Sequence, residues 1–326
     1  MTRPNFALVT RWCFVLLTLL PITGAIAQNY PNRPVRWVVP YPPGGTTDVI
    51  ARNVAQATSE TLGVAIVVEN KAGAGGLIGM DAVAKATADG YTFLVSDASL
   101  ATAPSLYKKM PFDPAKDLEA VALFVTVPHV IVVNPSLPVT NVAELVALSK
   151  KQPGKLNFSS GGLGSPLQLA GEVFRVATGV EWTHVPYKGA GPAILAVVSD
   201  EAQVAAPSVP AVLGQISGGK LRAIAVTSEK RIPNLRDVPT VFELGYPKAA
   251  MTGWVGLHAP AGTPQQMSAR MHAAVAQALA SPALQTRLLE QGATLDAGSA
   301  EAYAKMVASE IARWRVIVQA AGITPE

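Results

Sequence analysis

A short segment at residues 38–48, VVPYPPGGTTD, passes from an apolar run through a rigid turn into the start of a helix. The valines are typical of a buried strand, and the prolines restrict the backbone of the turn. Gly44 and Gly45 leave the amide groups of the turn uncovered by side chains. A helix that begins at Thr46 adds a partial positive charge of about half a unit at its N-terminus. The segment therefore predicts a strand–turn–helix unit with an anion-binding site at the turn.

Two features of this segment also have a simpler explanation. The sequence PPGG alone could form only a tight turn, because proline and glycine favour turns of several kinds. The strand before it and the helix after it favour the anion site. Asp48 lies in the first turn of the expected helix, where it either suits the helix dipole or accepts hydrogen bonds from the loop amides. The sequence keeps both interpretations of Asp48 open.

The same strand–turn–helix unit recurs along the chain. Apolar runs at 64–68 and 92–95 predict further strands, and each leads into a glycine-rich or serine-rich turn and a helix. A second series of units begins after Pro128. Alternation of this kind predicts an α/β fold with two halves, in which the C-terminal part returns to the first half. We expect mostly parallel sheets flanked by helices, with ligands bound at the carboxyl ends of the strands.

The first 27 residues have the three parts of a secretory signal peptide. Arg3 and Arg11 supply the positive region, residues 12–20 the apolar core, and Ala25 and Ala27 the small-residue cleavage pattern. The apolar core is shorter than the roughly 20 residues that a membrane-spanning helix needs. We therefore expect cleavage after Ala27 and export from the cytoplasm.

Composition and spacing exclude several classes of function. The only cysteine, Cys13, leaves with the signal, so no disulfide, thiol nucleophile or cysteine-bound metal is expected. The 26 basic and 22 acidic residues nearly balance, which argues against a nucleic-acid or anionic-membrane partner. The four histidines include no pair spaced i, i+4, so no metal site is expected. The glycine-rich run at 73–79 does not fit a nucleotide-binding motif, and no cofactor is expected.

Residues 159–166, SSGGLGSP, are the counterpart of the first turn in the second half of the chain. They offer hydroxyl groups, backbone amides and the start of a helix. Ser165 lacks the G-x-S-x-G surroundings of a nucleophile elbow, so serine catalysis is not expected. Further along, Lys188 could pair with an anion, although a solvated lysine is the commoner outcome, and His184 is expected to be structural.

A set of motifs carries a resemblance to a known family. They are PPGG-x-x-D at 42–48, ENKAGAGG at 69–76, DGYT at 89–92, FSSG with GS at 158–165, HVPYKG at 184–189, DVPT at 237–240 and W-x-GL-x-AP at 254–260. Each motif alone is weak, but their order and spacing together are highly specific. The mature chain resembles, over nearly all its length, the periplasmic substrate-binding receptors of tripartite tricarboxylate transporters, the Bug family.

The resemblance implies a type II periplasmic binding protein with two domains and a ligand cleft between them. Residues 28–127 and 250–326 would form domain 1, and residues 128–249 domain 2. Such receptors close about a hinge on a small organic acid, catalyse no reaction and deliver the acid to the membrane subunits of a transporter. We accordingly expect a periplasmic monomer. Two alternatives stay open: a sensor that presents a bound carboxylate to a signalling partner, and, with less support, an exported hydrolase.

The resemblance also assigns the residues of the cleft by position. The amides of Gly44, Gly45 and Thr46 are expected to hold one carboxylate, partly through ordered water, and the loop after Phe158 to cap the other end of the ligand. The full set of expected ligand-binding residues is Pro43, Gly44, Gly45, Thr46, Asp48, Ser96, Ser99, Ser159, Ser160, Gly161, Gly164, Ser165, Pro207 and Ser208. Two positions depart from the family pattern: Gln168 stands where many relatives carry histidine, and Asp200 where relatives usually carry glycine.

Overall fold

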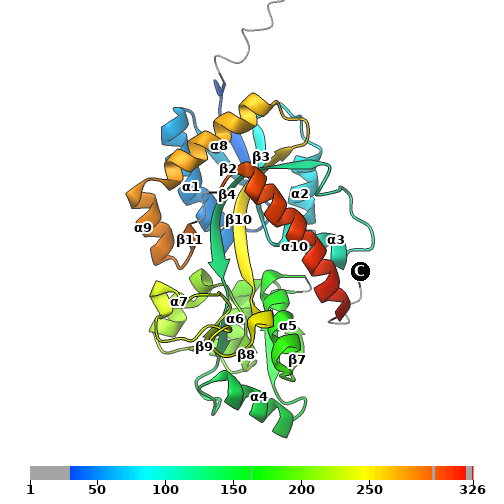
Figure 1. The fold of residues 1–326 in the computed structure, drawn as a ribbon, viewed down its shortest axis with the longest axis vertical. Helices are drawn as coiled ribbons and strands as arrows, with labels where there is room; N and C mark the ends of the chain where they lie inside the picture. The colour runs from blue at the N-terminus through cyan, green and yellow to red at the C-terminus, as the bar shows by residue number, and fades with distance from the viewer. Residues whose placement is uncertain (1–29, 163, 296–297, 321–324, 326) are drawn as a thin grey trace, which may run out of the picture.

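The computed structural model describes residues 30–162, 164–295, 298–320 and 325. The expected signal peptide and its cleavage point after Ala27 lie outside the described residues. The chain forms two lobes, each built around one β-sheet with helices on its faces (Figure 1). The two-domain α/β architecture expected from the alternation of elements is confirmed.

The first lobe contains a six-stranded sheet in the order β11-β4-β10-β3-β1-β2. Its strands are β1 (Val35–Val39), β2 (Ile66–Asn70), β3 (Thr92–Asp97), β4 (Leu118–Pro128), β10 (Thr252–Pro260) and β11 (Thr294–Leu295). β1 runs parallel to β2 and β3, whereas β10 runs antiparallel to β3 and β4, and β11 runs antiparallel to β4.

The second lobe contains a five-stranded sheet in the order β7-β6-β8-β5-β9. Its strands are β5 (Val130–Val133), β6 (Asn157–Ser160), β7 (Thr183–Pro186), β8 (Val204–Ala205) and β9 (Arg222–Val226). β6 is parallel to β7 and β8, but β5 is antiparallel to β8 and β9. Most strands of each sheet run in the same direction, as expected, and both sheets are mixed because β5, β10 and β11 run against the others. β5 and β10 each enter their lobe from the other lobe, at the edge where the parallel strands end, so they run in the opposite direction.

Helices cover both faces of the first-lobe sheet. They are α1 (Thr46–Leu62), α2 (Leu77–Ala84), α3 (Ser99–Leu106), α8 (Gln265–Leu279), α9 (Pro282–Glu290) and α10 (Ala300–Ala320). Trp37 of β1 packs with Ile50 of α1 and Met271 of α8, while its neighbour Val38 belongs to the cluster on the other face, beneath α10. α10 crosses the front of this lobe in Figure 1. No helix in the described ranges combines the length and apolar character needed to cross a membrane.

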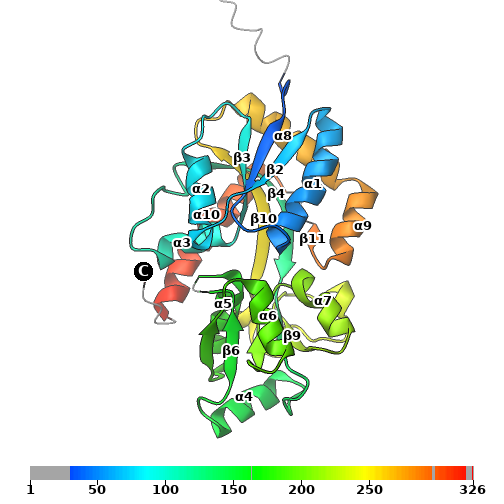
Figure 2. The same cartoon turned by 180° about the vertical axis from the view of Figure 1, so that it is seen from behind.

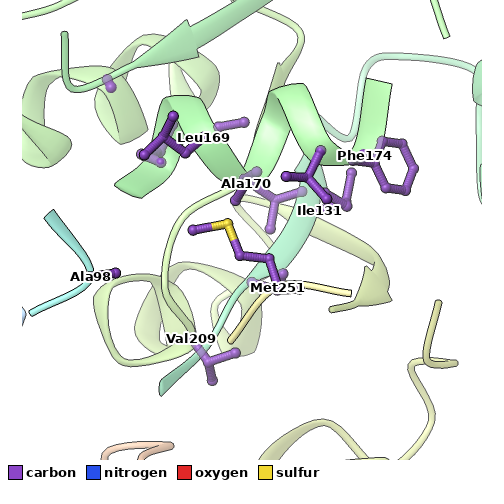
Figure 3. Packing of buried hydrophobic residues seen from close by; sticks show 14 of the residues in the cluster. Ala98, Ile131, Leu169, Ala170, Phe174, Val209 and Met251 are labelled. Carbon is purple, nitrogen blue, oxygen red and sulfur yellow. The ribbon is translucent and has the colours of Figure 1, made fainter. Parts of the chain in front are cut away.

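The helices of the second lobe place their starts toward the first lobe. α5 (Pro166–Thr178), α6 (Ala190–Val198) and α7 (Val209–Ser217) lie on the side that faces the first lobe, and α4 (Val142–Lys151) lies at the far end (Figure 2). A Cβ atom at Gly171 would lie 2.0 Å from the Phe158 ring, so α5 approaches β6 closely because glycine stands there. Ala170 of α5 packs near Ile131 of β5 and Met251 in the same core (Figure 3).

The chain crosses between the lobes from β4 into β5 at Pro128 and His129, and again where the 3-10 helix η4 (Pro247–Ala249) leads into β10. Pro128 and Thr252 are register partners, so the two crossings run side by side. Thr227 ties them together, because its amide donates to the carbonyl of His129 (2.9 Å) and its carbonyl accepts from the amide of Met251 (3.2 Å). We propose that these crossings form the hinge and mark the domain boundaries, near residues 128 and 250.

Candidate functional site

A cavity of about 560 Å³ lies between the two lobes. Its wall contains the starts of α1 and α3 from the first lobe and the residues before α5, α6 and α7 from the second. Trp254 of β10 and His129 at the lobe crossing also contribute to it. The cavity therefore combines turns that are far apart in the sequence, as expected for the carboxyl ends of strands in two facing sheets.

The N-terminus of α1 presents free backbone donors to this cavity. Gly45 is the N-cap residue and no side chain caps the helix. The amides of Thr46 and Thr47 have no hydrogen-bond partner among the described residues, as expected for the first turn of an uncapped helix. Together with the helix dipole, these amides favour an anion at this position.

The amide of Gly44 does not belong to this set of free donors. It donates to Oδ2 of Asp48 at 2.9 Å. The Asp48 side chain is buried and also accepts from Nε of Arg52 (3.1 Å) and Nδ2 of Asn70 (2.8 Å). Burial raises the pKa of Asp48, but the hydrogen bonds from Arg52, Gly44 and Asn70 outweigh it and lower the pKa overall. Asp48 thus shapes the loop by binding its amide, the second of the two interpretations left open above.

Asp97, at the end of β3, organises the neighbouring corner of the cavity. Its carboxylate accepts from the hydroxyls of Tyr41 and Thr47 (both 2.9 Å) and from the amide of Ser99 (3.0 Å). Tyr41 also contacts the Ser99 hydroxyl. Burial, reinforced by Asp97, raises the pKa of Tyr41 well above its usual value, so this phenol stays protonated. Ser99 lines the cavity, and its surroundings hold the start of α3 in place.

The loop before α5 uses most of its amides internally. The amide of Gly164 donates to Oε1 of Gln168 at 2.6 Å, and the amide of Gly162 donates to Oγ of Ser160 at 3.2 Å. Ser165 caps α5, since its hydroxyl accepts from the amide of Gln168. Gln168, one of the two departures from the family pattern, therefore stabilises the loop rather than facing a ligand.

The start of α6 supplies free donors from the second lobe. Gly189 is the N-cap residue, with φ of 111°, and no side chain caps this helix. The amides of Ala190 and Gly191 have no partner among the described residues, and both residues line the cavity. Lys188, directly before them, also lines it, is exposed and makes no ion pair with a described residue.

Helix starts, hydroxyls and one ammonium group thus face a shared space from both lobes. Thr46 of the first lobe and Ser208 of the second meet across it, with their hydroxyl oxygens 3.1 Å apart. Leu106, Leu167 and Trp254 give the wall an apolar part. Among the described residues, Asp97 has the only carboxylate in the wall, and this group is already surrounded by donors. The arrangement suits a small anion with an apolar body.

A family model described as the tripartite tricarboxylate transporter family receptor matches residues 50–323. The chain belongs to this receptor family. Protein BugT of Bordetella pertussis is 39% identical to it over 298 residues, which cover 91% of this chain and 91% of that protein. The resemblance to Bug-type receptors is confirmed.

Solved structures of related proteins have the same fold as this receptor. The periplasmic binding protein BugD has a TM-score of 0.84 at 37% identity, and the match covers 91% of this chain and 100% of that chain. R. palustris Rpa4515, solved with adipate, has a TM-score of 0.85 at 37% identity, again over 91% of this chain and 100% of that chain.

Most of the residues expected from the sequence meet in the cavity wall of the receptor. They are Pro43, Gly44, Gly45, Thr46, Ser99, Gly161, Gly164, Ser165 and Ser208. Asp97, His129 and the segment 188–192 also line the cavity, but the sequence pattern pointed to none of them apart from a weak suggestion of Lys188. The signal for Asp97 was present, because an acidic residue at the carboxyl end of a strand precedes a helix. The signal for 188–192 was K-G-A-G-P before an apolar helix, the same chemistry as the first turn.

Five expected residues, Asp48, Ser96, Ser159, Ser160 and Pro207, do not line this cavity. Asp48 supports the loop from behind. Ser96 is buried, with Oγ 2.7 Å from Nδ1 of His258. Ser159 is buried and donates to the carbonyl of Ala193 (2.8 Å). Ser160 is buried against His184, and Pro207 is buried, with its carbonyl accepting from the amide of Val130. The three serines belong to strands and Pro207 closely follows one, and their side chains are buried within a lobe rather than in the cavity wall.

Two of these serines pair with histidines, which bears on the hydrolase alternative. Ser96 lies beside His258, and Ser160 lies 2.6 Å from Nε2 of His184. Both serines have no exposed surface, and neither lines the cavity of the receptor. Burial lowers the pKa of His258 to about 3 and also lowers the pKa of His184. Among the described residues, no group of three or more His, Cys, Asp or Glu is placed to hold a metal ion.

Proposed function

We propose that this protein is an extracytoplasmic receptor that captures a small carboxylate between its lobes and delivers it to the membrane subunits of a tripartite tricarboxylate-type transporter. In this proposal the signal peptide is removed after Ala27, the mature chain acts in the periplasm as a monomer, and it catalyses no reaction and needs no cofactor. The ligand-binding residues are the cavity-lining members of the expected set, together with Lys188, Ala190 and Gly191.

The observation that carries the proposal is the pair of uncapped helix starts that face one cavity from opposite lobes. α1 offers the amides of Thr46 and Thr47, and α6 offers those of Ala190 and Gly191. A carboxylate accepts such charge-assisted hydrogen bonds strongly. Both ends of a short dicarboxylate, or the single carboxylate of a larger acid, find donors that need little rearrangement. Little conformational freedom is lost when a ligand binds such preformed turns.

The connection between the lobes fits a receptor that opens and closes. Side-by-side crossings at residues 128 and 250 permit hinge bending. Closure brings Lys188 and the start of α6 over a ligand already held by α1, and it excludes water, which strengthens each hydrogen bond. It also changes the relative positions of surfaces on the two lobes, which is what a membrane partner can recognise. The adipate bound by the related Rpa4515 supports a carboxylate as the ligand.

The experiment compares two substitutions at Thr46 in a carboxylate-binding assay. Proline is well tolerated at the first position of a helix, and the preceding Gly45, at φ −76° and ψ 167°, is compatible with it. Thr46→Pro removes one free amide and the hydroxyl, whereas Thr46→Ala removes the hydroxyl alone. Adipate, malate, glutamate and benzoate, with the neutral adipamide as a control, are tested by thermal shift and calorimetry.

We expect at least one acid and not adipamide to raise the melting temperature of the wild type. Thr46→Pro is expected to bind that acid about tenfold to a hundredfold more weakly than Thr46→Ala, because a hydrogen bond to a charged group contributes about 1.5–3 kcal/mol. Both variants should unfold near the wild-type temperature without ligand. No binding of any acid, or equal affinity of the two variants, would contradict the proposal.

A further inference from the structure

The charge around the mouth of the cavity bears on how an acid first reaches it. We infer that Lys71, Lys108 and Lys109 form a cationic rim that steers anionic ligands toward the cavity, where Lys188 receives them. This inference rests on the proposed function, because it takes a carboxylate as the ligand.

The backbone places the three lysines on one rim. Lys71 directly follows β2, at the edge of the sheet that faces the cavity, and the same turn brings Gly75 into the cavity wall. Tyr107, also in the wall, donates its hydroxyl to the backbone of the 3-10 helix η2 (Ala74–Gly76) at 3.4 Å. Lys108 and Lys109 follow Tyr107 immediately. The turn after β2 and the end of α3 therefore touch, and the three lysines lie in or next to these two segments, which contribute Gly75 and Tyr107 to the cavity wall.

These lysines carry charge that nearby acids do not neutralise. All three are exposed, and none makes an ion pair or a side-chain hydrogen bond with a described residue. Three acids on the same elements are paired with other cations, Glu69 with Arg36, Asp81 with Lys85 and Asp113 with Lys116. Asp117 instead accepts a hydrogen bond from the amide of Asp113 at 2.7 Å. The mouth thus keeps a positive excess that its neighbourhood does not cancel.

The local excess matters because the molecule as a whole is close to neutral. The formal net charge of the full chain is only +4, so its overall charge attracts anions weakly. A cluster of one sign beside a cleft focuses the field there and raises the rate of association with oppositely charged ligands. Exposed charges act over about 8–10 Å at 0.1–0.15 M salt and further at low salt. Steering by this rim therefore affects the association rate, and its effect depends on ionic strength.

The test compares two triple variants that remove the same charge from different places. Lys71→Gln/Lys108→Gln/Lys109→Gln neutralises the rim. Lys150→Gln/Lys151→Gln/Lys155→Gln is the matched control, because these exposed lysines lie at or after the end of α4, at the far end of the second lobe (Figure 2). The probe is whichever of adipate, malate, glutamate or benzoate binds the wild type. Stopped-flow tryptophan fluorescence, reported by Trp254 in the cavity wall, gives association and dissociation rates at NaCl concentrations from 10 to 500 mM.

The rim variant is expected to associate about threefold to tenfold more slowly than the wild type at 10 mM salt, within the range known for electrostatic steering. The difference should shrink toward none at 500 mM, with dissociation unchanged, and the control should match the wild type. Equal association rates for the two triple variants would overturn the rim while leaving the receptor function intact. A change confined to dissociation would also overturn it, because the lysines would then contact bound ligand. If none of the acids binds, the proposed function fails and the inference fails with it.

Discussion

The two lobes offer the cavity glycine-rich turns of similar sequence, but they differ in which amides are left free. In the first lobe, Asp48 occupies the amide of Gly44, and the next amides in the chain remain available at the start of α1. In the second lobe, Gln168 and Ser160 occupy the loop before α5, and the free amides lie further along, at the start of α6. In each lobe, polar side chains hold the turn while a neighbouring helix start faces the cavity.

This difference shows that a glycine-rich turn can have either of two roles in a binding cavity. A turn whose amides are bound internally is a rigid wall, whereas an uncapped helix start is a donor. The support in the first lobe is a charged, buried carboxylate with several donors, and that in the second is a neutral amide with one described donor. We therefore expect the first lobe to contribute more of the affinity, and the second lobe to close over a ligand already held.

The largest effect is expected from Asp48→Ala, which removes the support of the first-lobe turn. The amide of Gly44 and the guanidinium of Arg52 lose their acceptor, so the free energy of unfolding should fall by about 2–4 kcal/mol. The affinity for the acid should fall by about thirtyfold or more, because the helix start is no longer held in register with the loop. Urea unfolding and calorimetry measure the two quantities.

Asp48→Asn is the matched variant, because asparagine keeps one acceptor oxygen and should restore part of both losses. The pH dependence gives a further check. The folded pKa of Asp48 lies below its ordinary value of 3.8, so its stabilising effect is complete above that pH and is lost as the pH falls through the folded pKa. The stability difference between wild type and Asp48→Asn should therefore narrow below about pH 3.8. If Asp48→Ala binds the acid as tightly as the wild type does, the support of the first-lobe turn by Asp48 does not contribute to the affinity.

A smaller effect is expected from Gln168→Ala in the second lobe. The amide of Gly164 loses a neutral acceptor, which should cost about 0.5–1.5 kcal/mol of stability. Affinity should fall by only about threefold, because the donors of α6 are supported by a different part of the chain. Gln168→Glu keeps an acceptor at the same place and serves as the control. If Gln168→Ala weakens binding as much as Asp48→Ala does, the two lobes contribute equally to the affinity, and the expectation that the first lobe contributes more is wrong.

The sequence was sufficient to predict the elements and the first turn, because these depend on local signals. The valines before Pro40, the glycines at 44 and 45 and the helix after them specify their structure within a few residues. The mixed sheets were not predictable in this way. Whether β5 and β10 run with or against their neighbours depends on where the chain re-enters a lobe, and no local pattern contains that information.

The expected site residues that do not line the cavity have a related explanation. Ser96 and Asp97 are adjacent at the end of β3, and alternation along a strand sends only one of them toward the cavity corner. The sequence favoured the serine, but the structure places the aspartate there. Ser159 and Ser160 were chosen for their hydroxyls, yet each hydroxyl has a partner inside its own lobe. Composition shows that donors are present, and only tertiary contacts show which of them are already used.

A modest effect on affinity is expected at the contact between Ser208 of the second lobe and Thr46 of the first lobe. Ser208 is the N-cap residue of α7, but its hydroxyl caps no amide of that helix and instead lies 3.1 Å from the Thr46 hydroxyl across the cavity. Ser208→Ala should weaken acid binding about twofold to tenfold, because the bond helps to hold the lobes together and is worth about 0.5–1.5 kcal/mol. If Ser208 affects binding through its bond to Thr46, the double variant Thr46→Ala/Ser208→Ala should lose less affinity than the two single variants lose together. Strict additivity in calorimetry would mean that the two hydroxyls contact the ligand independently, and that closure of the lobes depends on the ligand rather than on this bond.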